Sequence, residues 1–165
     1  MESKGKAFRA LLGEEPYVFT GGIYSPLDAE IAERAGMKAI YMSGYSVAML
    51  NGWPDMGFLT MSEMTRTASM IASAVEIPII ADADDGYGSA LNTMRTVAEF
   101  VKSGVAGIHL EDQQLPKRCG HLSGKVLVDA EVMRPIAVLD FDPAGAADNG
   151  PSPHGFNPYF DLPPV

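Results

Sequence analysis

The chain has 165 residues, of which 47% are hydrophobic and 20% are charged, a composition typical of one globular domain with its own core. The 12 Lys and Arg against 21 Asp and Glu give a formal net charge of -9, which argues against a nucleic-acid partner because binding to phosphates needs clustered basic side chains. The single cysteine, Cys119, excludes an internal disulfide, and no apolar run reaches the roughly 18 to 20 residues that cross a bilayer. We therefore expect a cytoplasmic, unprocessed chain with no membrane partner.

Short apolar runs alternate with helical patterns from residue 17 to about residue 130, which predicts βα units around a parallel sheet. The runs expected to form strands are residues 17–20, 38–43, 78–83 and 106–111. A first helix should begin at Ser25 and Pro26 and end at Gly36, because these residues are typical of a cap, a first turn and a left-handed helix end. Thr60 and Glu63 form a capping-box pattern for a second helix to about residue 74.

A third helix is expected from an apolar spacing of three to four residues, and Gly104 should end it. The apolar positions are Leu91, Met94, Ala98 and Val101. After about residue 134 the composition changes, because half of the 12 prolines lie beyond Asp140 and no Lys or Arg follows Arg134. We therefore divide the chain into a folded part, residues 1–134, and an irregular, disordered Pro-rich tail, residues 135–165.

Acidic residues lie directly after the predicted strands. Asp82 and Asp84 follow an apolar run and precede a glycine-rich turn, and two residues that are two positions apart in a strand point the same way. Glu111 follows the next strand, and Asp55 lies in the loop before the second helix. Hard carboxylate oxygens of this kind suit Mg²⁺, whereas the alternative is an acidic turn in which each Asp bonds its own backbone. In a βα barrel this end of the sheet carries the chemistry.

The segment around Cys119 combines a thiol with three side chains that can carry positive charge, Lys117, Arg118 and His121. Such surroundings favour a reactive thiol that can transfer a proton. The alternative is that Cys119 is a small buried apolar residue, as free cysteines usually are.

Five motifs, in this order and spacing, resemble the isocitrate lyase and phosphoenolpyruvate mutase superfamily, and the similarity runs from about residue 5 to residue 131. They are Ser43-Gly44-Tyr45, Pro54-Asp55, Asp82-Ala83-Asp84, Glu111-Asp112-Gln113 and Lys117-Arg118-Cys119-Gly120-His121. The cysteine motif is similar to that of the lyases, whereas mutases and hydrolases of the superfamily generally lack it. The residues that follow it, 122–127, look more like isocitrate lyase than methylisocitrate lyase.

The resemblance implies an α/β fold, a (β/α)₈ TIM barrel in a homotetramer, of which this chain would hold about the first four βα units. A whole barrel needs about 250 residues, so residues 1–134 would be its N-terminal half. The implied reaction is the Mg²⁺-dependent cleavage of isocitrate, a small 2-hydroxy tricarboxylate, into glyoxylate and succinate. Methylisocitrate lyase activity and a catalytically inactive truncated remnant are the alternatives, and the cysteine motif disfavours mutase chemistry.

The resemblance also implies a role for each residue of the motifs. Asp82 would hold Mg²⁺, with its water shell ordered by Asp55, Asp84 and Glu111. Cys119 would protonate the succinate carbanion, tuned by Lys117, Arg118 and His121. The implied substrate contacts are Ser43, Gly44 and Tyr45 for the glyoxylate part and Arg118, Gly120 and His121 for the remaining carboxylates.

Overall fold

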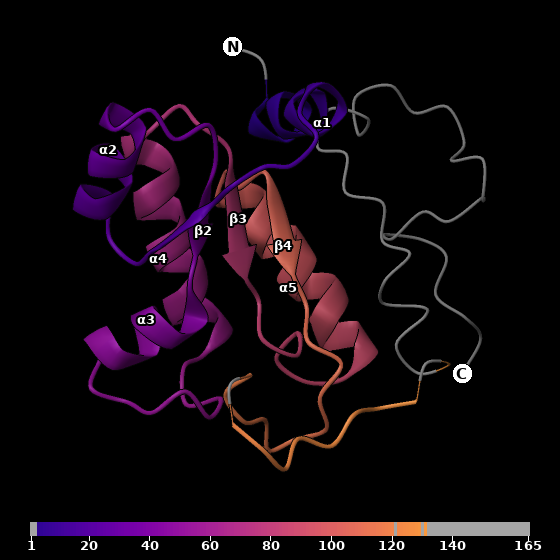
Figure 1. Cartoon of the computed structure of the whole chain (residues 1–165). Coiled ribbons are helices and arrows are strands. Elements are labelled where there is room, and N and C mark those ends of the chain that lie inside the picture. Colours follow the sequence, from indigo (N-terminus) through magenta and orange to yellow (C-terminus); the bar gives the residue numbers. More distant parts are fainter. Residues whose placement is uncertain (1–2, 121, 130, 132–165) are drawn as a thin grey trace.

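A computed structural model describes residues 3–120, 122–129 and 131 of the chain. In this part a four-stranded parallel sheet runs in the order β1-β2-β3-β4, with helices joining successive strands (Figure 1). The strands are β1 (Gly21–Ile23), β2 (Ile40–Met42), β3 (Ile79–Asp82) and β4 (Gly107–His109). The helices are α1 (Lys4–Glu14), α2 (Pro26–Arg34), α3 (Gly44–Leu50), α4 (Met61–Ala74) and α5 (Ala90–Lys102). The predicted α/β fold of consecutive βα units is confirmed, and the predicted tail lies outside the described residues.

The helix starts lie where the capping residues predict them. The Ser25 hydroxyl accepts a hydrogen bond from the Asp28 amide at 3.2 Å, and Pro26 is the first residue of α2. The capping box before α4 is complete, because the Glu63 carboxylate accepts from the Thr60 amide at 2.7 Å and the Thr60 hydroxyl accepts in return from the Glu63 amide. These bonds satisfy amides that a helix start otherwise leaves without a partner.

The first predicted strand is wrong, because β1 begins at Gly21 and not within residues 17–20. Tyr17 and Phe19 favour a strand by their side chains, yet they are 80% and 73% exposed. The strand is decided by its pairing with β2, where Gly21 lies opposite Ile40. The sequence patterns also missed α1 and α3. Helix α3 begins at Gly44 and is capped by Ser43, the last residue of the predicted strand 38–43.

The third predicted helix is present as α5, but its buried face differs from the predicted apolar stripe. Thr93, Thr96 and Phe100 are buried, whereas Leu91 is 63% exposed. The buried hydroxyl of Thr96 donates to the Gly86 carbonyl at 2.9 Å. A hydroxyl that is satisfied in this way is tolerated in a core, so apolar spacing alone selected the wrong face.

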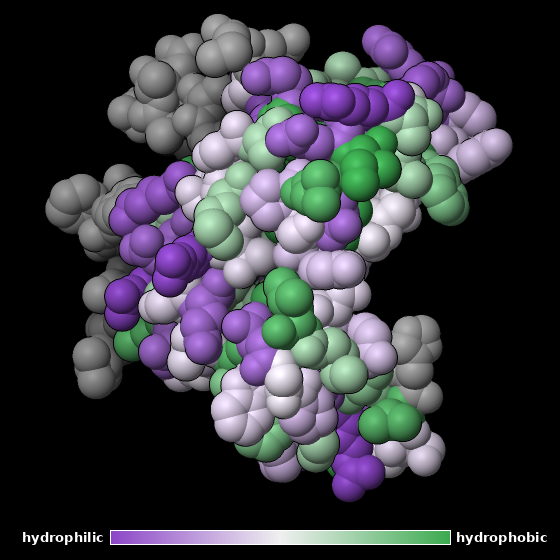
Figure 2. Space-filling model, turned by 90° about the vertical axis from the view of Figure 1, so that its left-hand side faces the viewer, coloured by the Kyte–Doolittle hydropathy of each residue, from purple (hydrophilic) through white to green (hydrophobic). Residues whose placement is uncertain are grey.

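The two faces of the sheet differ. Ile40, Met42 and Ile79 are fully buried in the core cluster that includes residues of α2, α4 and α5. Side chains alternate along a strand, so Tyr41 and Asp82 belong to the opposite, more open face. Figure 1 shows the helices α4 and α5 behind the sheet, and Figure 2 shows from the side that the outline of the molecule is hollowed.

In the described part of the chain, no helix has both the length and the apolar character to cross a bilayer.

Candidate active site

The candidate site lies at the carboxyl end of the strands. In Figure 1 the strand arrowheads point toward α3 and toward the segment that follows β4, whereas α1 lies at the opposite end of the sheet. Asp82 is the last residue of β3, Ser43 follows β2 directly, and Glu111 follows β4 after one residue. A parallel sheet brings these strand ends to one edge, which is why residues far apart in sequence share this region.

Asp82 is buried and held by two backbone amides. One carboxylate oxygen, Oδ2, accepts from the Gly44 amide at 3.2 Å, and the other, Oδ1, accepts from the Asp84 amide at 3.0 Å. A Cβ atom at position 44 would lie 2.6 Å from Oδ2 of Asp82, closer than any side chain permits. Glycine at position 44 therefore lets the start of α3 approach this carboxylate.

Lys117 connects the thiol segment to two of the acidic residues. Its side chain is 2% exposed, its Nζ atom lies 2.9 Å from Oδ1 of Asp55, and it also forms an ion pair with Asp84. Burial alone would lower the pKa of Lys117, but the hydrogen bonds and charges of Asp84 and Asp55 outweigh it and raise that pKa. Burial raises the pKa of Asp84 to about 6, although Lys117 opposes this rise. Residues from three distant segments thus meet as one buried charged cluster.

The resemblance implies that Asp55 and Asp84 order a metal's water shell and that Lys117 tunes Cys119, and these roles stay predictions. In the structure the Lys117 ammonium pairs with both carboxylates. No pattern in the sequence predicts that pairing, because the three residues are separated by 29 and 33 positions. The structure brings Asp55, Asp84 and Lys117 together directly, with Asp82 joined to Asp84 through the amide hydrogen bond.

Glu111 and Gln113 form a second polar group beside this cluster. The Glu111 amide donates to the Asp84 carbonyl at 2.7 Å, and the Glu111 carboxylate accepts from Nε2 of Gln113 at 2.6 Å. Gln113 is buried and also bonds both the amide and the carbonyl of Arg118. Gln113 belongs to one of the five sequence motifs, but we predicted no role for it.

Cys119 lies in a loop of which residues 115–120 and 122–125 are described, and we call these residues the thiol loop. Antiparallel backbone pairing closes its base, since Gln113 bridges to Leu127 and the Gln114 amide donates to the Val126 carbonyl at 2.8 Å. The Cys119 thiol is free and only 9% of the residue is exposed. This burial agrees with the alternative interpretation of the cysteine and leaves its proton-transfer role a prediction. His121 lies outside the described residues.

The residues predicted to bind substrate are spread over two segments. The Ser43 hydroxyl accepts from the Ser46 amide at 3.3 Å as the cap of α3, whereas Tyr45 is 51% exposed. Arg118 and Gly120 are exposed in the thiol loop, and the Gly120 carbonyl accepts from the Lys125 ammonium. Their role as substrate contacts therefore stays a prediction.

A cavity of about 260 Å³ adjoins the charged cluster. Asp84, Lys117 and Tyr87 line it, together with Gly57, Leu59, Asp85, Gly88 and Leu115. Tyr87 was not predicted; it has a left-handed backbone with φ of 62°, and its pKa is raised by burial and then by the charge of Asp84. The cavity thus places a phenol beside the carboxylates.

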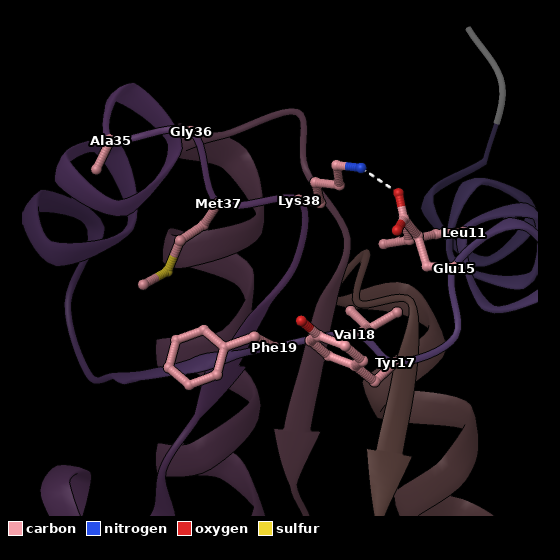
Figure 3. A pocket seen from close by; sticks show the side chains of 9 residues that line it. All are labelled: Leu11, Glu15, Tyr17, Val18, Phe19, Ala35, Gly36, Met37 and Lys38. Carbon is pink, nitrogen blue, oxygen red and sulfur yellow. Dashed lines mark hydrogen bonds and ion pairs between the residues drawn. The ribbon is translucent and has the colours of Figure 1, made fainter.

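A second cavity of about 260 Å³ lies at the amino end of the sheet (Figure 3). Side chains of α1, of the chain that leads to β1 and of the turn before β2 line it, and the Lys38 ammonium pairs with the Glu15 carboxylate at its edge. It contains none of the predicted site residues. The cavity at the carboxyl end, by contrast, is lined by two of them, Asp84 and Lys117.

The carboxylates offer Mg²⁺ a limited set of protein ligands. Across residues 3–120, 122–129 and 131, no three His, Cys, Asp or Glu side chains are grouped closely enough to hold a metal by themselves. Asp55 and Asp84 are already paired with Lys117. Each oxygen of Asp82 accepts one backbone amide, the Tyr41 hydroxyl also interacts with this carboxylate, and its remaining lone pairs can accept a further contact. Mg²⁺ usually keeps several waters and takes one or two carboxylates, so the residues present fit a water-rich ion on Asp82.

Comparison with known proteins identifies the family. The family model of phosphoenolpyruvate phosphomutase matches residues 8–137. Isocitrate lyase of Haloferax volcanii is 46% identical over 129 residues, covering 78% of this chain and 37% of that protein. A 2-methylisocitrate lyase of Aeropyrum pernix is 42% identical and covers 81% of this chain and 43% of its own length. The carboxyvinyl-carboxyphosphonate phosphorylmutase of Arabidopsis thaliana is 49% identical, over 75% of this chain and 37% of that protein.

Solved structures agree with these relatives. The phosphoenolpyruvate phosphomutase of Streptomyces platensis subsp. rosaceus has a TM-score of 0.78 and 34% identity and covers 84% of this chain and 50% of that one. A phosphonopyruvate hydrolase in complex with oxalate and Mg²⁺ has a TM-score of 0.71 and 34% identity and covers 81% and 45%. The chain thus spans about two fifths of the length of the curated relatives that it matches. It belongs to the phosphoenolpyruvate mutase/isocitrate lyase superfamily, of whose barrel it contains consecutive βα units.

Proposed function

We propose that this chain is the N-terminal part of a Mg²⁺-dependent carbon-carbon lyase that cleaves isocitrate into glyoxylate and succinate. The main support is the buried contact of Lys117 with Asp55 and Asp84, because it brings the thiol segment to the acidic strand ends. The cysteine motif favours a lyase over the mutases, although the relatives of both kinds are similarly identical to this chain.

The charged cluster suits an anionic substrate. Lys117 compensates part of the negative charge of Asp55 and Asp84, so that a tricarboxylate meets less repulsion in a chain of net charge -9. Asp82 is the residue that would hold Mg²⁺, and Glu111 follows the neighbouring strand β4. When bound, Mg²⁺ supplies positive charge close to the oxygens that become negative as the carbon-carbon bond breaks.

Cys119 is the proposed proton donor. The substrate hydroxyl loses its proton to a base of the site, its O–H electron pair forms the C=O bond of glyoxylate, and the pair of the carbon-carbon bond stays on the succinate fragment. The thiol proton of Cys119 then moves to that carbon, and the proton taken from the hydroxyl restores the thiol. Residues of the complementary part of the barrel would complete the contacts with the substrate carboxylates, since the chain spans about two fifths of its relatives.

The test is a direct assay of the purified chain with isocitrate and Mg²⁺, with glyoxylate trapped as a coloured hydrazone. We expect glyoxylate that disappears with a chelator and falls roughly 10² to 10⁴-fold in Cys119→Ser, because a positioned proton donor contributes about that factor. Ser123→Ala, in the same loop, is the matched control. Unchanged turnover in Cys119→Ser would rule out the proposed role of the thiol.

Methylisocitrate in the same assay decides between the two lyase substrates, because the relatives of either kind support both. Much faster turnover of methylisocitrate would replace the substrate in our proposal. A second candidate function is a non-catalytic domain that pairs with a longer relative, which the strand edges favour: in the described part of the chain, β1 pairs only with β2 and β4 only with β3. A folded chain that makes no glyoxylate at any concentration would support this second candidate.

A further inference from the structure

The carboxamide of Gln113 holds the thiol loop from inside. Its Oε1 atom accepts from the Arg118 amide at 3.0 Å, and its Nε2 atom donates to the Arg118 carbonyl at 2.9 Å. Nε2 also donates to Oε2 of Glu111 at 2.6 Å. One buried side chain therefore joins the residue directly before Cys119 to a carboxylate at the carboxyl end of the sheet.

Only an amide of this length fits all three contacts. The Arg118 backbone presents one donor and one acceptor, and a carboxamide presents the complementary pair. Rotating the amide by 180° would place Nε2 against the Arg118 amide and Oε1 against the Glu111 carboxylate, so the contacts determine its orientation. Glutamate at position 113 would lack the donors, and methionine would lack both donor and acceptor.

The backbone of Gln113 is anchored at the same time. It bridges to Leu127 at the base of the thiol loop, and the neighbouring Val128 amide donates to the Asp112 carbonyl at 2.8 Å. The side chain thus extends from a paired segment into the loop that this pairing closes. A loop held both at its base and in its interior has fewer accessible conformations than one held at its base alone.

We propose that Gln113 is a positioning residue that sets the thiol loop against the Glu111 carboxylate. It acts through the Arg118 backbone, immediately before Cys119, and not by contact with a reactant. The catalytic purpose of this positioning rests on the proposed function, in which Cys119 donates a proton. The contacts themselves are testable without turnover and without Mg²⁺, so a failure of the proposed function would leave this inference standing.

The first test uses the unmodified full chain and compares the side-chain amides of Gln113 and Gln114 by NMR. Gln114 is exposed and its Nε2 makes one contact, with the Leu127 carbonyl at 3.2 Å. We expect the side-chain amide protons of Gln113 to exchange with solvent at least about tenfold more slowly, since its buried hydrogen bonds must open before exchange can occur. Equal exchange of the two side chains would overturn the proposal.

The second test is the alkylation rate of Cys119 in Gln113→Met, with Gln114→Met as the matched control. Because the chain contains one cysteine, each labelling event reports Cys119 alone. We expect Cys119 to be labelled at least about tenfold faster in Gln113→Met, at a rate that does not change when low concentrations of urea are added. The backbone amide of Arg118 should also exchange faster. The amides of Ile40 and Ile80 in the sheet should keep their protection.

These readouts separate positioning from a general contribution to stability. If Gln113→Met acted only by destabilising the fold, its faster labelling would rise with urea as steeply as global unfolding does, and this would overturn the proposal. Labelling within twofold of the unmodified chain would overturn it as well. If Gln113→Met does not fold, the exchange comparison in the unmodified chain decides the proposal by itself.

Discussion

The Lys117 ammonium lies 2.9 Å from the Asp55 carboxylate, and both side chains are almost entirely buried, at 2% and 11% exposure. Asp84 shares the same ammonium. Removing the cation leaves two carboxylates without compensation, so we expect Lys117→Met to lower the free energy of unfolding by about 3 to 5 kcal/mol. Urea titration followed by circular dichroism measures this loss. Lys125→Met, at an exposed position of the thiol loop, is the matched control, and equal stability of the two variants would contradict the importance of the cluster.

The pKa of Asp84 predicts a pH-dependent stability. Burial raises it from 3.8 to about 6, so Asp84 keeps its proton to a higher pH in the folded chain than in the unfolded chain. The proton on Asp84 stabilises the folded chain fully at a pH below the pKa that Asp84 has in the unfolded chain. This stabilisation is lost as the pH rises through the pKa that Asp84 has in the folded chain. We therefore expect the unfolding free energy of the unmodified chain to fall, relative to Asp84→Asn, between about pH 4 and pH 6.

That comparison is made by urea unfolding in the presence of a chelator. Both chains share their other titrating groups, so the difference between them isolates Asp84. A difference in unfolding free energy that stayed constant, or that grew in favour of the unmodified chain, across this range would contradict the raised pKa.

Gly44 is predicted to be intolerant of a side chain. Alanine would place its Cβ atom 2.6 Å from Oδ2 of Asp82, and this carboxylate is held on its other side by the Asp84 amide. We expect Gly44→Ala to lower the free energy of unfolding by about 1 to 3 kcal/mol, because overpacking forces the neighbours to shift. Gly120→Ala is the control, since nothing lies within 4 Å of a Cβ atom there. Similar thermal stability of both variants would show that the start of α3 adapts freely.

Mg²⁺ binding is predicted to depend on Asp82. A ligand that binds only the folded chain adds about 1.4 kcal/mol at a concentration tenfold above its Kd, so Mg²⁺ should raise the Tm of the unmodified chain. We expect this rise to disappear in Asp82→Asn and to remain in Asp112→Asn, which changes an exposed carboxylate that follows the neighbouring strand β4. Thermal unfolding with Ca²⁺ in place of Mg²⁺ adds a test of selectivity. An equal Mg²⁺-dependent rise in Asp82→Asn would move the metal to other ligands.

Local signals in the sequence predicted a large part of the fold. Ser25 and Thr60 mark helix starts because a cap acts on amides only two or three residues away, and three of the four predicted strands contain β2, β3 and β4. The first strand was misplaced by Tyr17 and Phe19, whose strand preference is local, whereas pairing with β2 selected Gly21. The face of α5 was misjudged for a related reason, since the partner of the buried Thr96 hydroxyl lies ten residues away.

By itself the sequence determined the superfamily, the α/β class and the residues that gather at the carboxyl ends of the strands, because motifs and periodicity act over short spans of chain. Only the tertiary structure decided which of these residues contact one another. Lys117 forms ion pairs with Asp55 and Asp84, and the Gln113 side chain forms hydrogen bonds with the Arg118 backbone and with Glu111. A buried ammonium or carboxamide has lost its contacts with water and therefore needs a complementary polar partner within the protein. Tertiary packing determines which group lies close enough to be that partner, and the order of residues along the chain does not show it.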